Sequence, residues 1–157
     1  MTPDVRKSVT VEVPIEEAFA VFTERPIEWW PSDHVLVDTR EEIVFEPRVD
    51  GRYYERSTDG AVIDWGRVIE WDPPRRLAMT WRIDGRWRPI DTDERASEIE
   101  VTFTALGPST TRVELAHVKL WRHGPDATLI HAAIDGPSPG DTLAKYARVV
   151  AAKKQAA

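Results

Sequence analysis

The side chains that can act as acids, bases or ligands are few, and His117 is the most informative of them. Its place in an alternating segment gives it the parity of Val113 and Leu115. The opposite parity carries Ala116 and Val118. If the parity of Val113 faces the interior, the His117 imidazole can bind or polarise a ligand oxygen. The alternative is a partly buried structural histidine that is hydrogen-bonded to a neighbour, and the sequence leaves both interpretations open.

Two carboxylates, Glu55 and Asp64, lie in segments that are expected to be strands. A buried carboxyl group in a cavity can transfer protons to a substrate. Solvent-facing positions explain both residues more simply, since charged side chains are seldom fully buried. We therefore assign no catalytic role to this pair.

The remaining groupings of reactive residues do not match known sites. Ser32, Asp33 and His34 place a nucleophile, an acid and a base side by side, but catalytic triads form through space rather than by sequence adjacency. His123 and His131 are eight residues apart, which does not match the i, i+4 spacing of a zinc pair. The chain has no cysteine, glycine-rich phosphate loop or dinucleotide fingerprint. We predict neither a metal nor a cofactor.

Aromatic side chains are the clearest indication of a ligand site, because the chain contains 7 Trp. Large rings on the inner side of a sheet favour a concave, apolar pocket with few polar groups, which is the usual design of a small-molecule site. The competing interpretation is an ordinary core with a few surface rings. We predict a cavity for a hydrophobic or aromatic small molecule, lined by Trp29, Trp30, Phe45, Trp65, Met79, Trp81 and His117.

A run of arginines interleaved with tryptophans is typical of nucleic-acid binding when taken alone. On one strand, however, Trp81 and Arg82 point to opposite faces, and the formal net charge of the chain is −6. A solvated hairpin edge is the simpler explanation, and an anionic ligand or an acidic partner surface is the lesser one. We predict no nucleic-acid partner. The residues concerned are Arg75, Arg76, Arg82, Arg86, Arg88, Trp81 and Trp87.

A sheet must position these side chains, because strand-like alternation dominates the middle of the chain. A helix is expected after the first strand, from Pro14 to about Pro26, since Pro suits a first helical position. The alternation predicts strands at residues 7–13, 43–47, 51–56, 61–71, 77–83, 98–105 and 111–120.

The end of the chain returns to helical periodicity. A long helix is expected at residues 139–152, with an apolar stripe of Leu143, Tyr146 and Val150. Residues 124–137 form either a short helix or an irregular lid. Strands in sequence, joined by tight turns and followed by a helix, predict an α+β domain in which an antiparallel sheet curls around that helix.

The length and composition indicate an ordinary globular protein. A chain of 157 residues suits one domain, which we expect to span residues 1–157. No apolar run reaches the roughly 18 residues of a membrane span, and the N-terminus lacks the apolar core of a signal peptide. We expect a cytoplasmic protein. A homodimer is compatible with the sequence, which does not determine the oligomeric state.

Several segments resemble one known superfamily. Residues 46–54 (EPRVDGRYY) are similar to an early hairpin of START-like (SRPBCC) proteins, and residues 65–77 (WGRVIEWDPPRRL) are similar to their central hairpin. Residues 11–19 (VEVPIEEAF) and 111–117 (TRVELAH) fit the same pattern. Within that superfamily, the chain most resembles the family homologous to the activator of heat-shock protein 90 ATPase.

The resemblance implies a helix-grip (START-like, Bet v 1-like) fold, a curved antiparallel sheet wrapped around a long C-terminal helix, often with an apolar cavity between them. One departure is that Gly136 precedes Pro137, where the family often has Gly-Trp at the start of the helix. The leading hypothesis is a small-molecule binding protein with no assigned catalysis. The alternatives are a polyketide cyclase/dehydratase-like enzyme using His117, or a chaperone-associated interaction module. A fold does not carry a function with it, so co-chaperone activity is not inherited from the family name.

Overall fold

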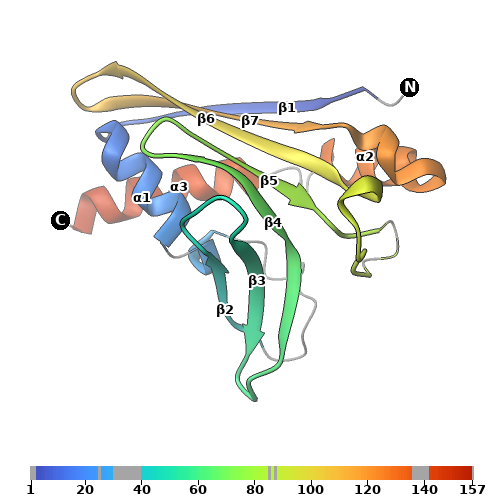
Figure 1. The fold of residues 1–157 in the computed structure, drawn as a ribbon. Coiled ribbons are helices and arrows are strands. Elements are labelled where there is room, and N and C mark those ends of the chain that lie inside the picture. The colour runs from blue at the N-terminus through green and yellow to red at the C-terminus, as the bar shows by residue number, and fades with distance from the viewer. Residues whose placement is uncertain are drawn as a thin grey trace.

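A curved antiparallel sheet forms the body of the protein (Figure 1). The computed structural model describes residues 3–24, 26–29, 40–84, 86, 88–135 and 142–156. Seven strands in this part of the chain follow the order β1-β7-β6-β5-β4-β3-β2, so β2 to β7 are a continuous meander and β1 pairs with β7. The strands are β1 (Val5–Val11), β2 (Arg40–Phe45), β3 (Arg52–Ser57), β4 (Val62–Asp72), β5 (Arg76–Trp81), β6 (Ser97–Gly107) and β7 (Thr110–Val118).

Two helices lie together inside the curve of the sheet, namely α1 (Ile15–Glu24) and α3 (Thr142–Ala156) (Figure 1). The Tyr146 hydroxyl joins them by donating a hydrogen bond of 2.6 Å to the carbonyl oxygen of Ala18. The third helix, α2 (Ala127–Asp135), packs near the start of β1. Short 3-10 turns cover Pro26–Glu28, Asp93–Arg95 and Leu120–Asp126. No helix among the described residues is long and apolar enough to cross a membrane.

The curvature arises where the strand registers shift. Pairing shifts between Tyr53 and Tyr54 on β3 and between Val68 and Glu70 on β4, and such bulges bend and twist a strand. Between them Gly66 lies so close to β5 that a Cβ would be 2.1 Å from the Thr80 carbonyl oxygen. Only glycine permits this approach, which lets β4 bend across the sheet and carry β3 and β2 around the helices.

The C-terminal helix packs with its predicted stripe inward. Leu143, Tyr146 and Val150 are all buried in the main core cluster, so the expected helix-grip arrangement is confirmed. The helix is described from Thr142, three residues after its expected start, and the expected first residues, 139–141, lie outside the described part. Of the two alternatives for residues 124–137, the helical one is correct over Ala127–Asp135.

Every predicted strand exists, with shifted ends. The first was expected at residues 7–13, but its ladder to β7 runs from Val5, opposite His117, to Val11, opposite Thr111. The Thr111 hydroxyl then donates a 2.9 Å hydrogen bond to the Val13 carbonyl oxygen, which turns the chain toward α1. Strand β5 was expected to reach residue 83 but ends at Trp81, because Ile83 forms an isolated bridge to Pro89. These shifts depend on long-range pairing, which local alternation does not contain.

Replacing Leu143 by alanine should reduce the free energy of unfolding by about 2–5 kcal/mol, because the substitution leaves a cavity under α3. Leu143 is 3% exposed, whereas Leu129 on α2 is 57% exposed. The matched control Leu129→Ala should therefore change stability by less than about 0.5 kcal/mol. Urea unfolding of both variants measures the difference, and equal losses would contradict the packing of α3 on the sheet.

Candidate functional site

The concave face of the sheet brings together most of the residues that were predicted to line a ligand site. Phe45, Trp65, Met79 and Trp81 belong to one continuous buried cluster that also contains Trp29. His117 is buried beside them, at 2% exposure. Trp30, the remaining predicted residue, lies outside the described part of the chain.

The strand register decides the orientation of His117. It pairs with Ile99 on β6, and Ile99 pairs with Met79 on β5, so the three side chains point to the same face. Met79 and Ile99 belong to the main core cluster. The sequence left open which side of this strand faces inward. The register shows that His117, with the parity of Val113, faces the concave side.

A polar network surrounds this histidine. The Ser97 hydroxyl oxygen lies 2.6 Å from His117 Nε2 and 2.7 Å from His123 Nε2, and the Ser97 backbone N–H donates to His123 Nε2 over 3.1 Å. Ser97 is the first residue of β6 and pairs directly with Trp81. His123 reaches it because Lys119 adopts a left-handed conformation (φ 59°) and turns the chain back after β7.

Burial keeps both imidazoles neutral. Removal from water, together with the neighbouring His123 ring, lowers the pKa of His117 from 6.5 to about 3. Burial also lowers the pKa of His123, although the Asp126 and Asp84 carboxylates act in the opposite direction. At neutral pH the network therefore contains hydrogen-bond donors and acceptors without a positive charge.

Two tryptophans continue the site from His117 across the sheet. The Trp81 ring meets His117 edge-on at 5.5 Å between centroids, and the Trp65 ring lies 5.2 Å from Trp81. Both indoles are buried, and both come from the central strands β4 and β5. The concave face therefore places two aromatic rings directly beside a neutral polar group, a combination that is common in small-molecule sites.

The other two predicted aromatic residues pack under the helices. Trp29 lies 4.5 Å and Phe45 lies 6.2 Å from Phe22 of α1, measured between ring centroids. Trp29 also meets Tyr146 of α3 edge-on. Their rings thus fix α1 and α3 to β2, in addition to any contact with a ligand.

A buried carboxyl group was misjudged from the sequence. Glu55 was expected to face solvent, but its side chain is 0% exposed because β3 directs Tyr53, Glu55 and Ser57 inward. The shared parity of Glu55 with Tyr53 is the signal that could have identified it. Asp64, in contrast, is partly exposed and pairs with Arg52 over 2.7 Å.

The arginine-rich stretch is largely neutralised by carboxylates. Arg75 pairs with Asp72, and Arg88 pairs with Asp84. Arg82 donates to Asp93 over 2.7 Å. Trp87 lies outside the described part of the chain. These ion pairs support the interpretation of a solvated hairpin edge.

The other groupings do not form a site in the described structure. Ser32, Asp33 and His34 lie outside the described residues. Among the residues that the structure describes, no cluster of three or more His, Asp or Glu side chains is arranged to hold a metal ion. His123 is engaged with Ser97, and His131 lies on α2.

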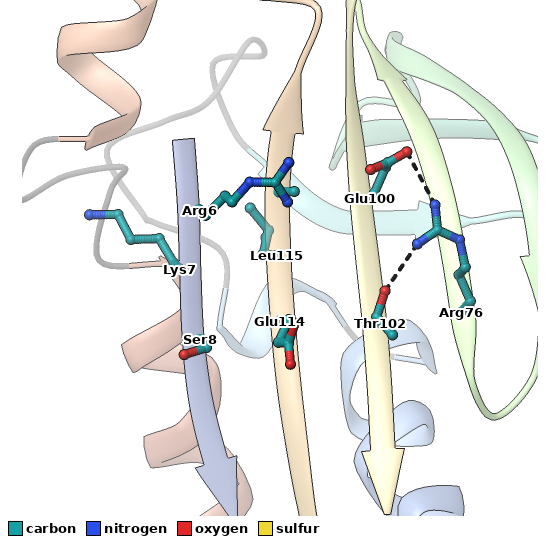
Figure 2. A pocket seen from close by; sticks show the side chains of 9 residues that line it. Arg6, Lys7, Ser8, Arg76, Glu100, Thr102, Glu114 and Leu115 are labelled. Carbon is teal, nitrogen blue, oxygen red and sulfur yellow. Dashed lines mark hydrogen bonds and ion pairs between the residues drawn. The ribbon is translucent and has the colours of Figure 1, made fainter. Parts of the chain in front are cut away.

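Figure 2 shows a hollow on the outer face of the sheet, with a volume of about 270 Å³. Arg76 in this hollow is already engaged, since it donates to Thr102 over 3.0 Å and pairs with Glu100 over 3.1 Å (Figure 2). A second hollow of about 650 Å³ lies between the end of α3 and β1, where Lys154 pairs with Glu12. Both lie away from the tryptophans of the concave face.

A curved antiparallel sheet that holds a C-terminal helix, with aromatic and neutral polar groups on its inner face, defines the helix-grip class of SRPBCC proteins. The chain belongs to the family of activator of Hsp90 ATPase homolog 1-like proteins, which matches residues 12–134. None of the curated proteins is a detectable match.

Similar proteins with solved structures include two whose function is known. An anthrahydroquino-γ-pyrone synthase, Txn09, is 62% identical, with 94% of this chain and 96% of that chain covered and a TM-score of 0.66. CalC, a self-sacrificing resistance protein from Micromonospora echinospora, is 30% identical, with 97% and 96% covered and a TM-score of 0.64. NE0264 from Nitrosomonas europaea, 15% identical with 96% and 95% covered, shares the fold at a TM-score of 0.65.

The buried His117 should make stability depend on pH. Its folded pKa lies below its unfolded value of 6.5, so its contribution is retained above pH 6.5 and lost as the pH falls toward about 3. Between pH 7 and pH 5 this loss should amount to about 2 kcal/mol. His117→Gln, which keeps a donor for Ser97, should remove that part of the pH dependence. Urea unfolding at both pH values tests this, and identical pH dependence in both proteins would contradict the neutral, buried state of His117.

Proposed function

We propose that this protein is a ring-closing enzyme that binds a polycyclic aromatic polyketide of the anthrahydroquinone type on the concave face and closes a γ-pyrone ring on it. The observation that carries the proposal is the 62% identity to an anthrahydroquino-γ-pyrone synthase over 94% of the chain. The buried aromatic and neutral polar groups of the concave face also support the proposal, because they suit an uncharged aromatic ligand.

The binding half of this proposal rests on the tryptophans. Trp65 and Trp81 are 0% and 6% exposed, so a flat aromatic ligand would displace side chains that pack on them and then contact their rings, and the flexible Met79 thioether would adapt to ring edges. We expect a cavity lined by these residues, with Trp29 and Phe45 packed against the helices, to suit a hydrophobic or aromatic ligand. Binding of a small apolar molecule is common to the enzyme proposed here and to the binding protein considered below.

The catalytic half follows from what the reaction requires. A γ-pyrone ring closes when a phenolic oxygen bonds to the carbon β to a carbonyl group. A 1,3-diketone side chain loses one water in the process, and an alkynyl ketone isomerises. In both cases the phenol gives up its proton, so the enzyme must orient the side chain and supply an acceptor. His117 is neutral and buried, and Glu55 is another buried group that can exchange a proton.

A second candidate is a binding protein without turnover. CalC, at 30% identity, is a self-sacrificing resistance protein, so one fold serves both enzymes and protective proteins among the relatives of this chain. Under this alternative the same concave face holds the ligand, but each protein molecule acts at most once. The number of product molecules formed per protein molecule therefore separates the two functions.

Trp81→Ala should weaken binding of a flat aromatic probe such as 2-methoxyanthraquinone by about tenfold or more, since a ring–ring contact beyond area burial is worth about 0.5–1.5 kcal/mol and the lost apolar area adds to it. Trp121→Ala is the matched control, because Trp121 is 49% exposed whereas Trp81 is 6% exposed. Quenching of intrinsic fluorescence or calorimetry measures the affinity. Equal effects of the two substitutions would place the ligand elsewhere.

The reaction itself can be tested with anthrahydroquinones that carry a phenol beside either a 1,3-diketone or an alkynyl ketone side chain. We expect more than one equivalent of γ-pyrone product per protein molecule with at least one of them, detected by liquid chromatography and mass spectrometry. His117→Phe should lower the rate by about 10²-fold or more if this residue accepts or orients the phenolic proton. Binding without turnover of either substrate class would favour the protective function instead.

A further inference from the structure

Three buried polar side chains meet where β6, β7 and the following turn come together. Ser97 is 0%, His117 is 2% and His123 is 9% exposed. The Ser97 hydroxyl lies between the two Nε2 atoms, at 2.6 Å from His117 and 2.7 Å from His123. A serine that bridges two neutral imidazoles can carry only one proton, so the positions of the protons in this network depend on one another.

The tautomer of His123 follows from the backbone. The Ser97 N–H points at His123 Nε2 over 3.1 Å, and a backbone N–H can only donate. His123 Nε2 is therefore the acceptor nitrogen, and the single proton of this neutral ring is on Nδ1. The Asp126 and Asp84 carboxylates favour the charged form of this ring, although burial outweighs them and lowers its pKa, and Nδ1 has no hydrogen-bond partner among the described residues.

The direction of the Ser97 hydroxyl follows next. If its proton pointed at His117, the Ser97 oxygen and the unprotonated His123 Nε2 would face each other at 2.7 Å with lone pairs on both atoms. Pointing the proton at His123 makes both short contacts hydrogen bonds, because His117 Nε2–H then donates to the Ser97 oxygen. The one lone pair of His123 Nε2 is then shared between the Ser97 O–H and the longer contact from the Ser97 N–H. The consistent arrangement is a chain from His117 Nε2–H through Ser97 to His123 Nε2.

We infer that Ser97, supported by His123, is a positioning residue that fixes His117 in the tautomer with a bare Nδ1, and that His117 Nδ1 accepts a hydrogen bond from a hydroxyl group of the ligand. The ligand part of this inference rests on the proposed function, and the tautomer part does not. The inference also specifies the chemical class of the ligand, which is an aromatic ring system that carries a free phenolic hydroxyl beside the Trp81 ring.

This arrangement also defines what His117 does in ring closure. The phenolic O–H of the substrate would donate to Nδ1, and the phenolic oxygen is the atom that bonds to the β carbon. As this C–O bond forms, the O–H bond breaks and the proton passes through Nδ1 to the side chain, whose carbon is protonated or whose hydroxyl leaves as water. The proton does not stay on the ring, because burial lowers the pKa of His117 to about 3. The Ser97 contact can then stabilise the imidazolium that forms briefly, because His117 Nε2–H keeps its acceptor throughout.

The tautomers can be observed directly in the full chain by long-range ¹H–¹⁵N spectra of the histidine side chains, assigned with His117→Gln and His123→Gln. We expect His117 to have a protonated Nε2 and an unprotonated Nδ1, and His123 to have the reverse. In Ser97→Ala, His117 should populate both tautomers, whereas His123 should keep its own, because the backbone N–H of residue 97 remains. Ser97→Thr, which keeps the hydroxyl, should restore the wild-type tautomer of His117. A proton on His117 Nδ1 in the wild type, or an unchanged His117 in Ser97→Ala, would overturn the role of Ser97.

The ligand part is tested with a matched pair, 2-hydroxyanthraquinone and 2-methoxyanthraquinone, at a pH where the phenol is neutral. The wild type should prefer the hydroxyl compound by roughly 2- to 10-fold, the effect of one neutral hydrogen bond. Ser97→Ala should reduce this preference and His117→Phe should abolish it, while Ser97→Thr should retain it. A preference that survives in His117→Phe would overturn the assignment of the acceptor. If neither compound binds the wild type, the proposed function and the ligand part both fail, and the spectra still decide the role of Ser97.

Discussion

The structure depends on how the concave face of the sheet is covered. A curved sheet of this kind exposes a wide apolar surface, and burial of that surface is the main force that holds the domain together. Helices α1 and α3 cover it jointly, and the hydrogen bond from Tyr146 to Ala18 fixes them to each other. The bend at Gly66 is also needed to cover the concave face, because it lets β3 and β2 wrap around the helices.

The same burial determines the chemistry of the site. Polar side chains that the strands direct inward lose their contact with water and must find partners within the protein. His117 bonds to Ser97 and Ser97 bonds to His123, and this buried network stays neutral at mildly acidic pH, where a surface histidine with a pKa of 6.5 becomes charged. A neutral acceptor beside Trp81 is compatible with an uncharged aromatic ligand, which a buried positive charge would not favour.

Family membership and fold leave the function open between catalysis and protection, as Txn09 and CalC illustrate. The shared architecture does not decide between the two functions, so the residues that decide are to be sought among the few polar groups of the concave face. In this chain those groups include Glu55, Ser97 and His117, which are all fully or almost fully buried. Substitutions at these positions should therefore change the chemistry while the sheet and α3 remain intact.

The sequence by itself determined the order of the elements, because alternation, proline positions and the stripe of Leu143, Tyr146 and Val150 are local signals. It also identified the aromatic residues that gather on the inner face. Only the tertiary structure decided which parity of β7 faces inward, that Glu55 is buried, and that His117 belongs with Ser97 and His123. Those three residues are brought together by strand pairing between β6 and β7 and by the turn at Lys119. Register and helix cover depend on which distant segments pair, so the alternation within one strand limits them but does not decide them.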